Sequence, residues 1–72
     1  MINIRDLKVG MRVLYKGTME EGIVSSWNDK YVFVKFDEQV SKFGIDETTA
    51  QACHRSQLLA GLQEEEKNGS NN

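Results

Sequence analysis

Residues 22–37, GIVSSWNDKYVFVKFD, contain two runs rich in β-branched and aromatic residues on either side of a short polar segment. In the second run, apolar and mixed positions alternate: Val32, Val34 and Phe36 against Tyr31, Phe33 and Lys35. This period of two is typical of a strand with one face buried. The stretch therefore predicts a β-hairpin whose inner face is apolar.

The length of the turn decides which residues face each other across this hairpin. We expect a three-residue turn, residues 28–30, because it keeps the core residues on one side of the sheet. The register then pairs Trp27 with Tyr31, Ser25 with Phe33 and Val24 with Val34. Trp27, Tyr31 and Phe33 are expected to share a face, either as a small second core covered by residues 38–47 or the N-terminal segment, or as an exposed binding patch.

The remaining elements are short. Strands are predicted at residues 11–16 (with Met11, Val13 and Tyr15 on one face), 22–27, 31–37 and 48–53 (ending at a buried Cys53). Residues 4–9 are expected to cover one end of the core with Ile4, Leu7 and Val9, and residues 38–47 to form a long loop. One helical turn is expected at residues 54–61, with Leu58 and Leu59 closing the core and Gly61 ending the turn. Four to five short antiparallel strands indicate an all-β fold, a closed or nearly closed small barrel.

Length and composition limit what such a chain can do. Its 72 residues make one small domain, which buries only about 60% of the surface that the unfolded chain exposes. The single cysteine excludes an internal disulfide, and no Cys or His spacing predicts a metal site, so we expect no metal and no cofactor. We expect a barrel domain over residues 1–62 and a disordered acidic and polar tail over residues 63–72.

Charge is balanced along the domain. The net charge of −2 comes from residues 61–72, which hold three Glu and one Lys, while residues 1–60 hold eight basic and eight acidic residues. This balance argues against strong binding to duplex nucleic acid, which needs a basic face. No apolar run has the length of a signal peptide or a membrane span, so we expect a cytoplasmic protein without a membrane partner.

The segments LKVGMRVLYKG, EGIVSSWNDKYVFVKFD and AQACHRSQLL together resemble the SH3-like small barrels, the Tudor, chromo-barrel and KOW-type domains. The matching positions span about residues 7–60 and are core and turn residues: Val9, Gly10, Val13, Gly22, Val24, Val32, Val34, Phe36, Asp37, Cys53 and Leu58. The resemblance implies a noncatalytic binding module, since such domains contact RNA, DNA, methylated or proline-rich peptides, or other subunits. Fold alone assigns no function. We expect an accessory or assembly factor from a bacterium or a phage.

Two functions from different classes remain open. The first is binding of a protein or peptide partner, and the alternative is binding of single-stranded RNA or DNA by stacking on an aromatic patch flanked by lysines. The candidate binding residues for either are Trp27, Tyr31, Phe33, Lys30, Lys35, Arg12 and Lys16. A phosphate-contacting strip could also be formed by Arg5, Lys8, Arg12 and Lys16. A third class, an oligomerising protein, would bury Phe43 and Ile45 against a second copy, but we expect a monomer or a weak homo-oligomer.

Catalysis is not expected. Cys53 and His54 are adjacent on a predicted strand, so their side chains should point to opposite faces and cannot act as a nucleophile and base. The paired acids have no calcium-loop spacing and are predicted to be solvated turn residues: Glu20 and Glu21, Asp37 and Glu38, Asp46 and Glu47.

Overall fold

The computed structural model describes residues 2–61, so the tail predicted over residues 63–72 lies outside the described part of the chain. Five strands are present: β1 (Arg12–Tyr15), β2 (Glu20–Trp27), β3 (Tyr31–Phe36), β4 (Gln51–His54) and β5 (Leu58–Ala60). Helix α1 (Asp37–Phe43) and two 3-10 turns, η1 (Ile4–Asp6) and η2 (Arg55–Gln57), complete the fold. The protein is a small all-β domain, as the sequence predicts.

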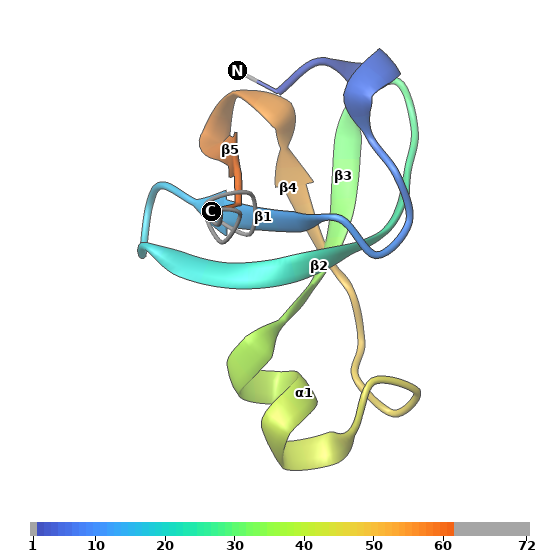
Figure 1. The fold of residues 1–72 in the computed structure, drawn as a ribbon, viewed down its shortest axis with the longest axis vertical. Helices are drawn as coiled ribbons and strands as arrows, with labels where there is room; N and C mark the ends of the chain where they lie inside the picture. The colour runs from blue at the N-terminus through green and yellow to red at the C-terminus, as the bar shows by residue number, and fades with distance from the viewer. Residues whose placement is uncertain (1, 62–72) are drawn as a thin grey trace, which may run out of the picture.

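All neighbouring strands pair antiparallel, in the order β4-β3-β2-β1-β5. The sheet is strongly bent, so that β1 and β2 cross the direction of β3 and β4 (Figure 1). Within residues 2–61, β4 and β5 are the two edges of the sheet and do not pair with each other. The barrel is therefore not closed, and one side of the bent sheet stays open.

The hairpin of β2 and β3 corrects the predicted register. Val24 does lie opposite Val34, but Trp27 lies opposite Val32 and Ser26 opposite Phe33. The amide of Asn28 donates to the carbonyl of Tyr31 at 2.9 Å, so only Asp29 and Lys30 form the turn. The extra residue is a bulge at Ser25, where the register shifts between Val24 and Ser26. A bulge reverses which face the following residues occupy, and it moves Trp27 to the inner side.

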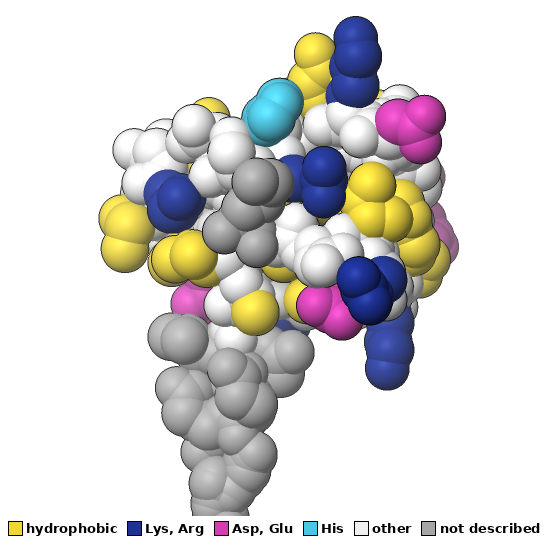
Figure 2. All heavy atoms as spheres, turned by 90° about the horizontal axis from the view of Figure 1, so that it is seen from above, with side chains coloured by type: hydrophobic (Ala, Val, Ile, Leu, Met, Phe, Trp, Pro, Cys, Tyr) yellow, Lys and Arg dark blue, Asp and Glu magenta, His cyan; other side chains and the backbone are white. Residues whose placement is uncertain are grey.

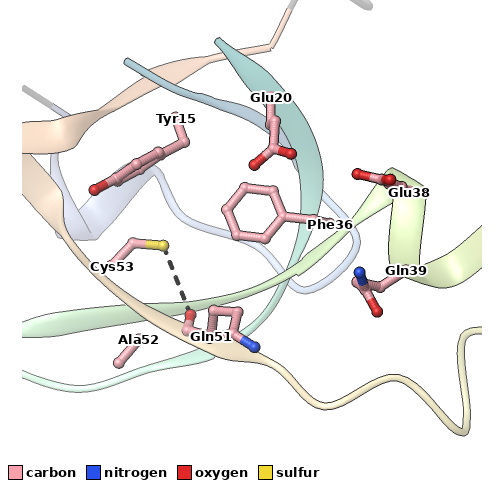
Figure 3. A pocket seen from close by; sticks show the side chains of 8 residues that line it. All are labelled: Tyr15, Glu20, Phe36, Glu38, Gln39, Gln51, Ala52 and Cys53. Carbon is pink, nitrogen blue, oxygen red and sulfur yellow. Dashed lines mark hydrogen bonds between the residues drawn. The ribbon is translucent and has the colours of Figure 1, made fainter. Parts of the chain in front are cut away.

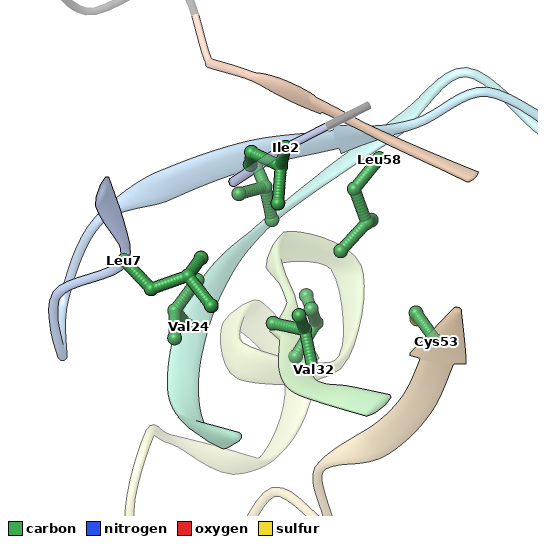
Figure 4. Close-up of a cluster of buried hydrophobic side chains, with 8 residues drawn as sticks. Ile2, Leu7, Val24, Val32, Cys53 and Leu58 are labelled. Atoms are coloured by element: carbon green, nitrogen blue, oxygen red, sulfur yellow. The ribbon is translucent and has the colours of Figure 1, made fainter. Parts of the chain in front are cut away.

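The core lies inside the bend. Its fully buried side chains come from four strands, with Cys53 beside them: Val13, Val24, Val32, Val34 and Leu58 (Figure 4). Met11, Tyr15, Trp27 and Phe36 are partly buried against this cluster. The inner faces predicted for β1 and β3 are therefore confirmed.

The N-terminal segment covers one end of this core, with a different set of side chains from that expected. Ile2 and Leu7 are buried and Ile4 packs against the core, but Val9 is 73% exposed. Gly10 follows with φ +90° and its amide donates to the carbonyl of Val24, so the chain turns sharply at this point. The turn leaves Val9 outside.

The prediction of a loop over residues 38–47 is wrong in part, because α1 occupies Asp37–Phe43. Asp37 and Glu38 stand in its first turn and Lys42 in its last, which suits the helix dipole. The helix ends at Gly44, with φ +84° and its amide on the carbonyl of Val40. α1 extends away from the sheet (Figure 1) and has no buried residue.

The C-terminal part is also more extended than predicted. The expected helical turn is the short η2, and Leu58 begins β5, which pairs with β1. Leu58 is fully buried, whereas Leu59 is exposed because the next residue of a strand points to the other face. β4 is shorter than residues 48–53 and ends at His54, and Thr48 instead lies buried with its hydroxyl on the carbonyl of Gly44.

Candidate functional site

The predicted cluster of Trp27, Tyr31 and Phe33 does not form. Trp27 packs against the core, because its cross-strand partner is the buried Val32. Tyr31 and Phe33 are two apart on β3 and lie together on the outer face of the sheet. The rings are therefore divided between a core role for Trp27 and a surface role for Tyr31 and Phe33.

The outer face carries a small aromatic surface near the hairpin. Tyr31 is 41% exposed, and its ring meets that of His54 edge-on, with 6.3 Å between centroids. The carboxamide oxygen of Asn28 accepts hydrogen bonds from the amides of Lys30 and Tyr31, which orders the turn. Phe33 is partly buried beside Ala52 on β4.

The four predicted basic residues are not gathered around these rings. Lys30 is exposed at the turn, but the ammonium of Lys35 donates to the carbonyl of Ile45 at 2.7 Å. Arg12 binds the carboxylates of Glu21 and Asp37, and Lys16 follows the last residue of β1. In Figure 2, basic side chains form separate spots among hydrophobic and acidic ones on the face shown. They do not form a continuous strip on this face.

Arg12 instead joins β1, β2 and α1. Its guanidinium donates to Glu21 Oε1 at 2.8 Å and to the carboxylate of Asp37. These hydrogen bonds, first that of Asp37 and then that of Glu21, raise the pKa of Arg12. Its charge is therefore already compensated inside the molecule, which argues against a role in phosphate binding.

A groove opens on the unclosed side of the sheet. It encloses about 380 Å³, between the ends of β1 and β3, the start of β2, the first turn of α1 and the edge strand β4 (Figure 3). Its lining residues are Tyr15, Glu20, Phe36, Glu38, Gln39, Gln51, Ala52 and Cys53. Five elements thus contribute to one concave surface, the usual form of a binding site.

Two aromatic rings line this groove. Tyr15 and Phe36 meet edge to face, with 6.1 Å between centroids and 77° between ring planes. Both are only partly buried. The Tyr15 ring packs closely on Gly17, since a Cβ added at that glycine would lie 2.8 Å from Tyr15 Cε2. The rings therefore offer apolar surface in a fixed arrangement.

The charged residues of the groove are acids. Glu20 accepts a hydrogen bond from the Thr18 hydroxyl at 3.0 Å. Glu38 meets Lys42 one turn later on α1 at 3.7 Å, a loose pair in which both side chains are more than half exposed. Figure 3 shows the carboxylate of Glu20 near the ring of Phe36, with that of Glu38 further from the ring on α1.

Cys53 lies at the floor of the groove and is not arranged for catalysis. Its thiol is oriented toward the carbonyl of Gln51 at 3.7 Å, and burial raises its pKa, which disfavours the nucleophilic thiolate. His54 points to the opposite face, toward Tyr31 and Ser56, as the strand pattern predicts. In residues 2–61 no three His, Cys, Asp or Glu side chains come together as metal ligands.

Reasoning from the sequence missed this groove. The sequence places Tyr15 and Phe36 on the inner face, which the structure confirms. Glu20 and Glu38, expected as solvated turn residues, are exposed but lie in β2 and α1. The available signal was that Tyr15 and Phe36 both end their strands on the core side, at positions where a ring can reach past the sheet. Their approach depends on the bend of the sheet and on α1, which no local pattern predicts.

In the described part of the chain no helix has the length and apolar composition that crossing a membrane requires. Comparison with protein-family models, with curated proteins and with solved structures finds no match, so the resemblance to SH3-like barrels stays a prediction.

Proposed function

We propose that this protein is a noncatalytic binding module that holds a peptide segment of a protein partner in the groove between β4 and α1. The observation that carries the proposal is the pair of partly exposed rings, Tyr15 and Phe36, inside a concave surface of about 380 Å³. Binding sites combine apolar walls with a few polar groups that orient the ligand. Here Gln39 and Gln51, which line the same groove, supply amide donors and acceptors.

The position of the groove favours a peptide over a globular surface. β4 is an edge of the sheet in residues 2–61, and Gln51, Ala52 and Cys53 of this strand line the groove. An extended chain can add to a sheet edge through backbone hydrogen bonds and place alternate side chains into adjoining hollows. A peptide lying along β4 would meet Tyr15 and Phe36 in this way.

A displayed library of random peptides, selected on the purified full chain, tests the proposal. Enriched peptides should bind in solution and shift the backbone amide resonances of residues 36–39 and 51–53. Resonances of residues 28–31, on the aromatic surface of the outer face, should stay unchanged. Failure to enrich any peptide, or shifts confined to residues 28–31, would contradict the proposal.

Single-stranded nucleic acid is a second candidate ligand, and it concerns the outer face. The specific observation is that Tyr31 and Phe33 remain on one face of β3, with His54 against Tyr31 and Lys30 at the adjacent turn. Stacking of bases on such rings contributes about 1–3 kcal/mol per base and tolerates a neutral protein. Balanced charge and the compensation of Arg12 favour the peptide.

Polarisation of labelled single-stranded DNA and RNA, at low and moderate salt, tests this second candidate. Tyr31→Ala should abolish any binding, while Phe36→Leu in the groove should leave it unchanged. Oligonucleotide binding that survives Tyr31→Ala would exclude the outer face as the site.

The proposal extends to the setting of the protein: a cytoplasmic accessory or assembly factor that is a monomer or a weak homo-oligomer. Exposed Phe43 and Ile45 are the side chains that self-association would cover. Size-exclusion chromatography with mass measurement at two concentrations should give the monomer mass at the lower one.

A further inference from the structure

The lining of the groove is acidic, although residues 1–60 carry no net charge. Residues 1–60 are neutral in sum, yet the charged residues that line the groove are Glu20 and Glu38, with neither Lys nor Arg among the lining residues that the structure describes. Two further acids stand next to them in sequence, Glu21 and Asp37, and both form ion pairs with Arg12 instead of lining the groove. The acidic character of the groove therefore comes from Glu20 and Glu38.

The rings that line the groove together with these acids add a second attraction for positive charge. A lysine or arginine head group is drawn to the face of an aromatic ring, and its methylene stem packs on apolar surface. Tyr15 and Phe36 are both only partly buried, and the Phe36 ring lies near the carboxylate of Glu20 (Figure 3). The carboxylates and the rings of the groove therefore both favour a ligand with a positively charged side chain.

The molecule already places a cation at the rim. The ammonium of Lys42 lies 3.7 Å from Glu38 Oε2, too far for a hydrogen bond, and both side chains are largely exposed. Such a pair within one helix is weak and exchanges readily. A ligand cation can take the place of Lys42 on Glu38 at little cost.

We infer that the groove selects a positively charged peptide segment, with a lysine or arginine side chain lying against Tyr15 and Phe36 and its head group at Glu20 and Glu38. This inference rests on the proposed function and names its ligand class. Negatively charged ligands, nucleic acid included, are disfavoured in this groove by the same carboxylates.

The test uses the full chain and three labelled peptides of equal length that alternate alanine with lysine, with glutamine or with glutamate. Fluorescence polarisation should rank the lysine peptide first and the glutamate peptide last. The preference for lysine should shrink as salt rises, because the attracting charges are exposed. An arginine version of the peptide shows whether a planar head group is preferred.

Three variants test whether these acids cause the preference for lysine. Glu20→Gln combined with Glu38→Gln keeps side-chain size and should weaken lysine-peptide binding about fivefold, with loss of most of the salt dependence. Glu47→Gln makes the same change at an exposed acid outside the groove and should leave binding unchanged. Lys42→Gln removes the competing ammonium and should strengthen binding about twofold.

The outcomes separate the inference from the function on which it rests. Equal binding of the three peptides, or an unchanged preference in the double variant, overturns the selection for cations while the binding module stands. Absence of binding by all peptides, in this assay and in the library selection, overturns both. Loss of the preference in the double variant alone supports the inference.

Discussion

The bent sheet buries its apolar side chains completely, whereas residues 37–50, between β3 and β4, leave theirs largely exposed. Val13 and Val32 have no accessible surface, but Phe43 is 57% exposed and α1 has no buried residue. The sheet is stabilised by apolar burial, while α1 is held by Arg12 on Asp37 and by the hydroxyl of Thr48 on Gly44. Segments with few buried contacts open at lower free energy than the core, so α1, which supplies Glu38 and Gln39 to the groove, is the less stable wall.

The largest effect is expected for Val34→Asp, inside the sheet. An unpaired charge at this fully buried position costs about 3–5 kcal/mol, close to the whole stability of a small domain. The variant should be unfolded by circular dichroism and show no cooperative thermal transition. Phe33→Asp, one residue away on the outer face, is the matched control and should stay folded. A folded Val34→Asp protein would disprove the assigned faces.

Gly22→Ala should come next, because β2 and β3 approach closely here. An added Cβ would lie 2.6 Å from Val34 Cγ1 and 2.7 Å from the carbonyl oxygen of Lys35, and the backbone cannot yield easily. We expect a loss of about 1–3 kcal/mol in urea unfolding. Ser26→Ala on the exposed side of the same strand should change the stability little. An unaltered midpoint for Gly22→Ala would mean that the strands are further apart.

Arg12→Gln removes the side chain that links the sheet to α1. Loss of the ion pairs with Glu21 and Asp37 should cost about 1 kcal/mol, since the partners are partly exposed. Hydrogen exchange should show faster opening of α1 amides, with protection of the β3 amides nearly retained. The difference from the wild type should shrink at high salt. Equal loss of protection in both regions would show that α1 and the sheet unfold together.

Phe43→Ser should have the smallest effect, within about 0.5 kcal/mol, because this side chain is more than half exposed at the end of α1. Thermal melting at two protein concentrations checks it. A large loss that grows with concentration would instead place Phe43 in an interface between copies of the chain.

The sequence predicts the sheet better than the surfaces around it. Alternation in β3 was enough to assign Val32 and Val34 to the core, because one buried face of a strand requires a period of two. The bulge was not predictable, since an extra residue in the turn or at Ser25 equally keeps Val24 opposite Val34. The choice is made by packing, because the bulge lets Trp27 reach the core.

Helix α1 was not predicted either, because the local sequence signals of a helix are missing. Its only apolar positions are Val40 and Phe43, too few to define a helical face in a seven-residue element. Its N-cap residue, Phe36, makes no side-chain cap, so the usual start signal is missing. Arg12, twenty-five residues before Asp37, supplies the stabilising contact instead.

The sequence by itself determined an all-β domain, the inner faces of β1 and β3, and the opposite orientation of Cys53 and His54, because these follow from local alternation along a strand. The tertiary structure decided the bulge at Ser25, the separation of Trp27 from Tyr31, and the meeting of Tyr15 and Phe36 with the acids of β2 and α1. These features join residues distant in sequence, and their arrangement depends on how the sheet bends and which contacts then satisfy its edges and charges.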